Sequence, residues 1–221
     1  MLSQNIEVEA KFKVNNLKRV IEKLKAAGAK QNWADTIEDY NFTLKQRDFW
    51  RTVEALRVRI IASKKGGILT YKPSGKKAQK TMAVKEYETY VENPKQLMKI
   101  FSYLDIVPLS VLPYVKKTRY DYTCGEFNII IDKYPLVGTF IEIEKIVNSE
   151  SEVKNAKKKI DEFSAKLGFT EKDRQKVSVG FLLKDAVQKE KKARHEKDER
   201  GGRHMNKTRT SKWQSLEEIS Y

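Results

Sequence analysis

Cysteine, histidine and long apolar runs are scarce in this chain of 221 residues, and each absence excludes a class of protein. The single cysteine, Cys124, excludes an internal disulfide and a zinc site built from several cysteines, and it fits a reducing compartment. Both histidines, His195 and His204, lie near the C-terminal end, which excludes Ser-His-Asp and Cys-His catalysis from the rest of the chain. Any chemistry there must use carboxylates, lysines, arginines, hydroxyls or a metal.

No apolar run approaches the ~20 residues that a membrane span requires. The N-terminus also lacks a basic segment followed by an apolar one, which a secretory signal would need. We therefore expect a cytoplasmic protein with no membrane partner. The length allows one domain with a sizeable core or two small domains.

Charge is what the chain has in abundance. Its 45 basic and 30 acidic residues leave a net charge of +15, which predicts a polyanionic partner. A nucleotide, a polyphosphate, a nucleic acid and an acidic surface all fit this charge, so net charge does not choose among them.

Residues 6–12 alternate between apolar and charged side chains, the pattern of a strand with one face in a core. Glu7, Glu9 and Lys11 therefore share the other face, with about 7 Å between successive neighbours. Two carboxylates and an ammonium group can hold a divalent cation, Mg²⁺ or Mn²⁺, together with an anionic ligand. The alternative is a solvated face whose charges neutralise one another, and this stretch taken alone favours that alternative.

Eight segments read as strands and four as helices. Strands are predicted over residues 6–12, 40–44, 55–61, 68–72, 82–91, 115–124, 127–132 and 139–147, and helices over 17–28, 94–104, 149–167 and 177–187. Asn16 and the Asn93-Pro94 pair are typical helix starts, and Gly66-Gly67 is typical of a hairpin turn. Consecutive strands with short turns predict an α+β fold with one antiparallel sheet, which tends to curl or close at this size.

The composition changes near residue 188, so we divide the chain into a domain, 1–187, and a basic tail, 188–221, which we expect to be disordered. The tail alternates basic with acidic residues, so nucleic-acid binding through it should be weak at most. The sequence leaves the oligomeric state open, including a homodimer.

The charged face of the first strand has counterparts on other strands. Alternation places Arg57 with Arg59, Lys117 with Arg119, and Glu142 with Glu144, while the opposite faces are mostly apolar. In an open sheet these charges would be a wet surface. In a curled sheet they would converge on one lumen, which should then hold water, a metal and a polyanion such as a chain of phosphates.

The same residues resemble a known family, the CYTH superfamily of triphosphate tunnel enzymes. Residues 6–12 are similar to its E-x-E-x-K opening. The resemblance continues in order through Asp39 to Phe42, Leu69 to Pro73 (L-T-Y-K), Lys117 to Arg119 (K-x-R), Ile131-Asp132 and Phe140 to Glu144. Residues 47–49 and 54–59 most resemble the class IV adenylyl cyclases. Val179 departs from the pattern, because tyrosine is usual there.

The resemblance implies an eight-stranded antiparallel β-barrel, a tunnel with helices packed outside, that binds a triphosphate with one or two divalent metals. It implies metal ligands at Glu7, Glu9, Asp132, Glu142 and Glu144, and substrate contacts at Lys11, Arg57, Arg59, Lys72, Lys117, Arg119 and Lys176. We assign catalytic roles to Glu7, Lys11 and Glu88. Glu86 and Glu88 should face inward unless a slip of one residue exchanges them with Lys85.

The leading hypothesis is a class IV adenylate cyclase that is dependent on Mg²⁺ or Mn²⁺ and converts ATP to cyclic AMP and pyrophosphate. The second is a triphosphatase acting on inorganic triphosphate, thiamine triphosphate or a nucleoside triphosphate. A third, a non-enzymatic module for polyphosphate or RNA, is disfavoured because the expected inward positions carry charges in place of stacking aromatics.

Overall fold

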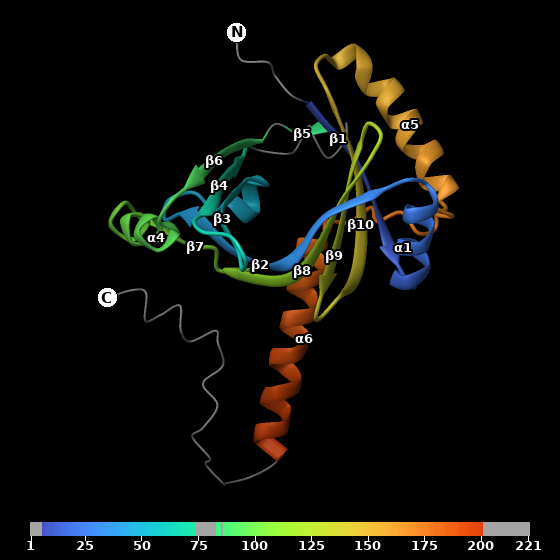
Figure 1. Ribbon diagram of the computed structural model, residues 1–221. Helices are drawn as coiled ribbons and strands as arrows, with labels where there is room; N and C mark the ends of the chain where they lie inside the picture. Colours follow the sequence, from blue (N-terminus) through green and yellow to red (C-terminus); the bar gives the residue numbers. More distant parts are fainter. Residues whose placement is uncertain (1–5, 74–82, 85, 201–221) are drawn as a thin grey trace.

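The computed structural model of the chain describes residues 6–73, 83–84 and 86–200, and Figure 1 shows their arrangement. The strands are β1 (Ile6–Val14), β2 (Lys30–Leu44), β3 (Ala55–Ile61), β4 (Gly67–Lys72), β5 (Ala83–Val84), β6 (Tyr87–Val91), β7 (Ile106–Pro108), β8 (Tyr114–Cys124), β9 (Phe127–Tyr134) and β10 (Gly138–Val147). The helices are α1 (Leu17–Ala26), α2 (Phe49–Thr52), α4 (Pro94–Tyr103), α5 (Val153–Lys166) and α6 (Val179–Arg200), with a 3₁₀ turn over Glu150–Glu152 before α5.

All described strands belong to one antiparallel sheet, in the order β5-β1-β10-β9-β8-β2-β3-β4-β6, with β7 added beside β2. The first and last strands of this order, β5 and β6, are close together in the sequence, because only Lys85 and Glu86 separate them. Three residue steps span about 10 Å at most. The two edges of the sheet must therefore approach each other, and the sheet curls. The predicted α+β fold with a curled antiparallel sheet is confirmed.

The outer face of the curled sheet carries two apolar cores. The larger one lies beneath α1 and α5, where Val8, Ile141 and Ile143 are fully buried, and each such side chain contributes about 1.5–3 kcal/mol. The second lies beneath α4, where Phe42 and Val58 pack against Met98 and Phe101. In Figure 1 these helices flank the sheet on opposite sides.

The predicted helix starts are confirmed. The Asn16 side chain accepts a hydrogen bond from the backbone of Arg19, and Asn93 accepts one from Gln96 ahead of Pro94 at the start of α4. The Gly66-Gly67 turn connects β3 and β4, and Gly66 has a φ of +71°, which favours glycine.

Several element boundaries differ from the sequence-based expectation. Strand β2 has 15 residues because it pairs with β8, β3 and β7 in turn, and its first half has no regular alternation that would show in the sequence. The predicted strand 82–91 is divided into β5 and β6, which pair with different neighbours. The short helix α2 and strand β7 were not predicted.

The helix predicted to end at residue 187 continues as α6 to Arg200, so residues 188–200 are helical where disorder was expected. The charged residues of this part are good helix formers, which the compositional argument did not weigh. The division of the chain at 187 stays a prediction, and residues 201–221 lie outside the described part. None of the helices within the described residues is both long and apolar enough to cross a membrane.

Candidate active site

The inner face of the curled sheet carries the charged residues of β1 and β10. Val8 and Ala10 point outward into the core beneath α5, so alternation turns Glu7, Glu9 and Lys11 inward. Antiparallel pairing places Glu9 opposite Glu144 and Lys11 opposite Glu142. Four acidic residues and one lysine thus come from two neighbouring strands; the sequence predicted that these side chains share the inward face, but not that the two strands are neighbours.

Glu9, Glu142 and Glu144 form an acidic cluster in which one carboxylate oxygen from each residue lies within 4.8 Å of the others. Lys11 Nζ lies 2.5 Å from Glu142, and Glu7 shares a side-chain hydrogen bond with Glu144. The cluster has three hard oxygen ligands and one nearby cation, so it suits a divalent ion of the Mg²⁺ or Mn²⁺ type.

Like-charge crowding shifts the pKa values of this acidic cluster apart. Repulsion from Glu142, together with burial, raises the pKa of Glu9 to about 8. Burial and the neighbouring carboxylates raise the pKa of Glu144 to about 10. Burial also opposes ionisation of Glu142, but the ammonium of Lys11 outweighs it and holds that pKa near 2. Protons therefore occupy part of the cluster unless a cation replaces them.

A second group, which we call the ion-paired belt, lies on β2, β3, β8 and β9. Asp132 accepts hydrogen bonds from Lys117 (2.7 Å) and from two nitrogens of Arg119 (both 2.7 Å). Asp39 accepts two from Arg59, at 2.7 and 3.1 Å, and lies 3.6 Å from Lys117. All five residues of the belt are buried.

The pKa values of the carboxyl groups in the belt are shifted in the opposite direction from those of the acidic cluster. Burial raises the pKa of Asp39, but Arg59, Arg57 and Lys117 outweigh it and hold that pKa well below its usual range. At Asp132 burial is likewise outweighed by Lys117 and Arg119, so its pKa is also lowered. Both aspartates are therefore ionised and fully engaged by cations at neutral pH.

The third part of the inner face centres on Arg57. Its guanidinium contacts Thr70 (3.4 Å), Glu86 (3.5 Å) and Glu88 (3.9 Å), and Lys72 pairs with Glu86 at 2.6 Å. The Arg57 Nε is buried, and it has no hydrogen-bond acceptor among the described residues. An orphaned buried donor is costly, and an anionic ligand would satisfy it. Glu86 and Glu88 do face inward; Lys85 lies outside the described residues.

Carboxyl groups outnumber cations on the inner face. Its ion pairs and electrostatic contacts connect six cations with eight carboxyl groups within the described residues: Lys11, Arg57, Arg59, Lys72, Lys117 and Arg119 with Glu7, Glu9, Asp39, Glu86, Glu88, Asp132, Glu142 and Glu144. Protons on Glu9 and Glu144 offset this excess near neutral pH, so the face has no net positive charge to offer an anion. A divalent cation that replaces these protons would add positive charge, so these residues fit a metal in addition to a phosphate ligand.

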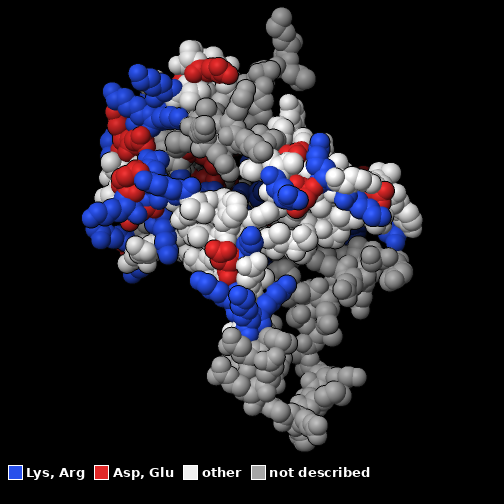
Figure 2. Space-filling model, turned by 180° about the vertical axis from the view of Figure 1, so that it is seen from behind, with Lys and Arg blue, Asp and Glu red and all other residues white. Residues whose placement is uncertain are grey.

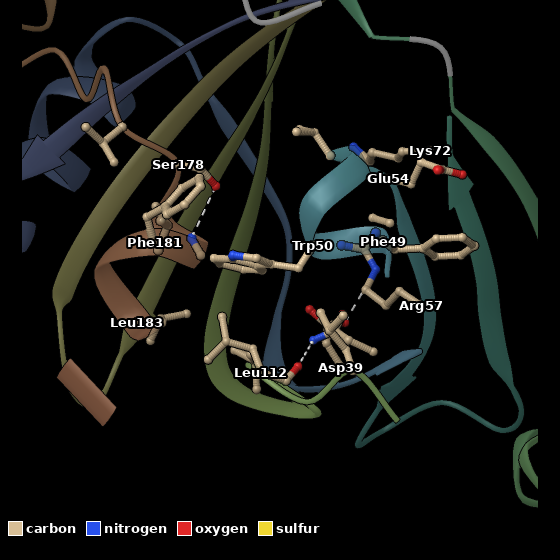
Figure 3. A pocket seen from close by; sticks show the side chains of 18 of the residues that line it. Asp39, Phe49, Trp50, Glu54, Arg57, Lys72, Leu112, Ser178, Phe181 and Leu183 are labelled. Carbon is tan, nitrogen blue, oxygen red and sulfur yellow. Dashed lines mark hydrogen bonds and ion pairs between the residues drawn. The ribbon is translucent and has the colours of Figure 1, made fainter. Parts of the chain in front are cut away.

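A cavity of about 680 Å³ opens beside these charges. Glu9, Lys11, Asp39, Arg57 and Lys72 contribute to its wall, and Figure 3 shows Arg57 next to Asp39 with Lys72 on the same side. Lysine and arginine also cover much of the molecular surface seen in Figure 2, with acidic side chains between them. The cavity therefore lies in a basic protein but has acidic residues in its own wall.

The opposite wall of the cavity comes from α2 and the start of α6, which pack on the inner face of the sheet. Trp50, Phe181, Leu112 and Leu183 meet there (Figure 3). Lys176, in the segment that leads into α6, lines the cavity, but its side chain is 70% exposed and its ammonium pairs with Glu171 at 3.0 Å.

Most of the predicted site residues are thus brought together, with three differences in grouping. Glu7, expected among the metal ligands, lies beside the acidic cluster, hydrogen-bonded to Glu144, and is not one of its three members. Asp132, expected among the metal ligands, lies between Lys117 and Arg119 and is not in the acidic cluster. Lys176 is close to the cavity but directed to a surface pair. Arg59, Lys117 and Arg119 face inward, and their charges are engaged by Asp39 and Asp132.

Sequence reasoning missed two acidic residues and the apolar wall. Asp39 was noted only as part of a motif, although its register opposite Arg59 would have identified it as the arginine's partner. Glu86 was given only a direction, and the structure makes it the bridge between Arg57 and Lys72. Trp50 gave no signal, because a helix of four residues has no detectable periodicity. Phe181 lies in a predicted helix, but the sequence did not show that this helix lines the cavity.

Comparison with known proteins agrees with this geometry. A CYTH domain profile matches residues 5–178. The chain belongs to the CYTH family. Over 149 residues, which are 66% of this chain and 81% of the relative, it is 34% identical to a protein of Methanocaldococcus jannaschii named "putative adenylate cyclase".

Two solved structures resemble this CYTH chain closely in fold. A protein of Pyrococcus horikoshii superimposes with a TM-score of 0.68 at 28% identity, covering 81% of this chain and 99% of that one. The X-ray structure of a "putative adenylate cyclase" from Vibrio parahaemolyticus gives a TM-score of 0.70 at 20% identity, with 80% and 97% covered. The latter likeness supports the fold alone.

Proposed function

We propose that this CYTH protein is a metal-dependent enzyme that acts on a triphosphate, and specifically an adenylate cyclase of class IV type. One observation carries the proposal: a three-carboxylate cluster and a set of buried cations share the inner face of one curled sheet, beside a cavity. The name of the Methanocaldococcus relative, at 34% identity, supports the cyclase activity over other reactions of triphosphates.

In the proposed reaction the ribose 3′-hydroxyl of ATP attacks the α-phosphorus and gives its proton to an inner-face carboxylate such as Glu7, a new P–O bond closes the cyclic phosphodiester, and the bond to the β-phosphate breaks to release pyrophosphate. Glu9, Glu142 and Glu144 would hold the divalent ion, with Glu7 beside them. When bound, that ion supplies positive charge against the phosphate oxygens.

The residues of the chain act mainly by positioning and by charge. Arg57 offers a phosphate oxygen its Nε, which lies 3.8 Å from Asp39 but has no hydrogen-bond acceptor among the described residues, and Lys11 and Lys72 add ammonium groups from the facing strands. The ion-paired belt holds Arg59, Lys117 and Arg119 in fixed places, so their field does not need to reorganise as pyrophosphate leaves. Curling of the sheet limits access of bulk water to the reacting atoms.

A triphosphatase is the second candidate, because the inner face has carboxylates beyond the acidic cluster. Glu7 lies next to Glu144, and Glu88 accepts a hydrogen bond from Thr70 at 2.7 Å. Either carboxylate could orient a water molecule for attack at the terminal phosphorus. Substrates of this activity would be inorganic triphosphate, thiamine triphosphate or a nucleoside triphosphate.

Product analysis separates the candidates. Purified protein is incubated with Mg²⁺ or Mn²⁺ and either ATP or inorganic triphosphate, and the products are identified by chromatography. Cyclic AMP and pyrophosphate from ATP support the cyclase, and orthophosphate from triphosphate supports the triphosphatase. Absence of turnover with both substrates and both metals contradicts an enzymatic role.

A further inference from the structure

The cavity beside the charged face has two chemically different walls. One consists of the cations and carboxylates of β1, β2, β3 and β4. The other is apolar and aromatic and is contributed by α2, the β7–β8 connection and the first turns of α6. A ligand that fills both halves must have a phosphate chain at one end and a flat or apolar group at the other.

Two aromatic rings define the apolar wall. The centroids of Trp50 and Phe181 lie 4.8 Å apart with a 60° tilt, and Figure 3 shows Trp50 extending from α2 toward Phe181. This spacing leaves no room for a planar group between the two rings, so a ligand ring would stack against a surface of the pair. Phe181 keeps 40% of its area exposed although it lines the cavity, so it has such a surface to offer.

A cation lies beside the same aromatic pair. Lys184 Nζ, one turn after Phe181 in α6, lies 5.6 Å from the centroid of the Trp50 ring. The contact fixes the orientation of the indole and keeps positive charge near the aromatic wall. A partly exposed aromatic pair with a neighbouring cation is the combination that stacks the bases of nucleic acids.

Resting on the function proposed above, we propose that Trp50 and Phe181 form the base-binding wall of the site and make it selective for nucleoside triphosphates over inorganic triphosphate. The phosphate chain would lie at Arg57 and Lys72, and the base would stack on the aromatic pair at the other side of the cavity. In this arrangement the aromatic residues of α2 and α6 determine which class of triphosphate binds, and the charged residues of the sheet carry out the reaction.

The test is a binding comparison with two ligands that a cyclase cannot turn over, α,β-methylene-ATP and bis-methylene triphosphonate, titrated calorimetrically into the full chain with Mn²⁺. The variants are Trp50→Leu and Phe181→Leu, which keep an apolar side chain in place. The matched control is Trp33→Leu, because Trp33 is also half-buried and carries a lysine, Lys64, 4.9 Å from its ring centroid, but does not line the cavity.

We expect both cavity variants to bind the ATP analogue about tenfold more weakly, since one base stack contributes on the order of 1–3 kcal/mol. Their affinity for the triphosphonate, and both affinities of the Trp33→Leu control, should change less than twofold. Unchanged affinity for the ATP analogue, or an equal loss for both ligands, overturns the inference while leaving triphosphate binding intact. If wild-type protein binds neither ligand, the proposed function fails and the inference fails with it.

Discussion

The acidic cluster and the ion-paired belt are built from the same residue types on the same face of one sheet, yet they behave in opposite ways. In the belt, each aspartate is engaged by at least two cations, and its pKa is lowered. In the cluster, three glutamates share Lys11, and two of them have raised pKa values. A carboxylate with two or more neighbouring cations is ionised and stabilises the fold. Carboxylates that share a single cation have raised pKa values and hold protons until a cationic ligand binds.

The largest expected effect is a loss of enzymatic activity when residues of the acidic cluster are replaced. Glu142→Gln or Glu144→Gln removes a charged metal ligand, so metal-dependent turnover should fall at least about 100-fold, more than substitutions around a metal's ligands usually cost. The rate is measured over a range of Mn²⁺ concentrations. Glu38→Gln, on the outer face where Glu38 pairs with Lys116, is the matched control and should keep its activity. Full activity in both cluster variants would rule out this metal site.

The next effect concerns stability and should be confined to the belt. Asp132→Asn leaves Lys117 and Arg119 buried without their anion, which should cost about 3–5 kcal/mol of unfolding free energy. Glu144→Gln should cost little in the metal-free protein, because its carboxyl is already protonated near neutral pH. Urea denaturation of both variants provides the comparison, and equal destabilisation would contradict the division into two regions.

Arg57 lies between the two regions and tests ligand binding. Arg57→Ala should weaken binding of bis-methylene triphosphonate by about 2–5 kcal/mol, the range for a buried charge-assisted contact. Arg19→Ala is a suitable control, since Arg19 is exposed on α1 and does not line the cavity. Calorimetry that finds normal binding in Arg57→Ala, with only the melting temperature lowered, would contradict the role of its orphaned Nε.

The smallest effect is a pH dependence whose sign differs between the regions. The raised pKa values of Glu9 and Glu144 mean that the folded protein binds more protons than the unfolded chain between about pH 4.5 and 10, so the metal-free protein loses stability as pH rises through that window. Lowered pKa values at Asp39 and Asp132 contribute stability that is present above pH 4 and is lost at lower pH.

Melting temperatures from pH 3 to 9, with EDTA or with Mn²⁺, measure both trends. Mn²⁺ should remove the decline above pH 4.5, since the cation replaces the protons. If the melting temperature in EDTA stays constant above pH 4.5, the pKa values of the acidic cluster are not raised, which would contradict the account.

Much of the fold and of the charged face could be predicted from sequence because both depend on period-two alternation. In β1, β3 and β10 the apolar positions fixed which face turns outward, and Glu9, Arg57 and Glu142 then had to turn inward. Alternation gives the direction of a side chain but not its partner, so the sequence did not show that Asp132 would form ion pairs with Lys117 and Arg119 across the β8–β9 hairpin. Nor could it show that α2 and α6 meet, since Trp50 and Phe181 are 131 positions apart.

The central claim is that the inner face binds a phosphate chain only when a divalent cation replaces the protons of the acidic cluster and adds positive charge. Calorimetric titration of bis-methylene triphosphonate into the protein, with EDTA and then with Mn²⁺, tests it directly. The account predicts binding with Mn²⁺ and none with EDTA. Equal affinity in both titrations, or no binding in either, would contradict it.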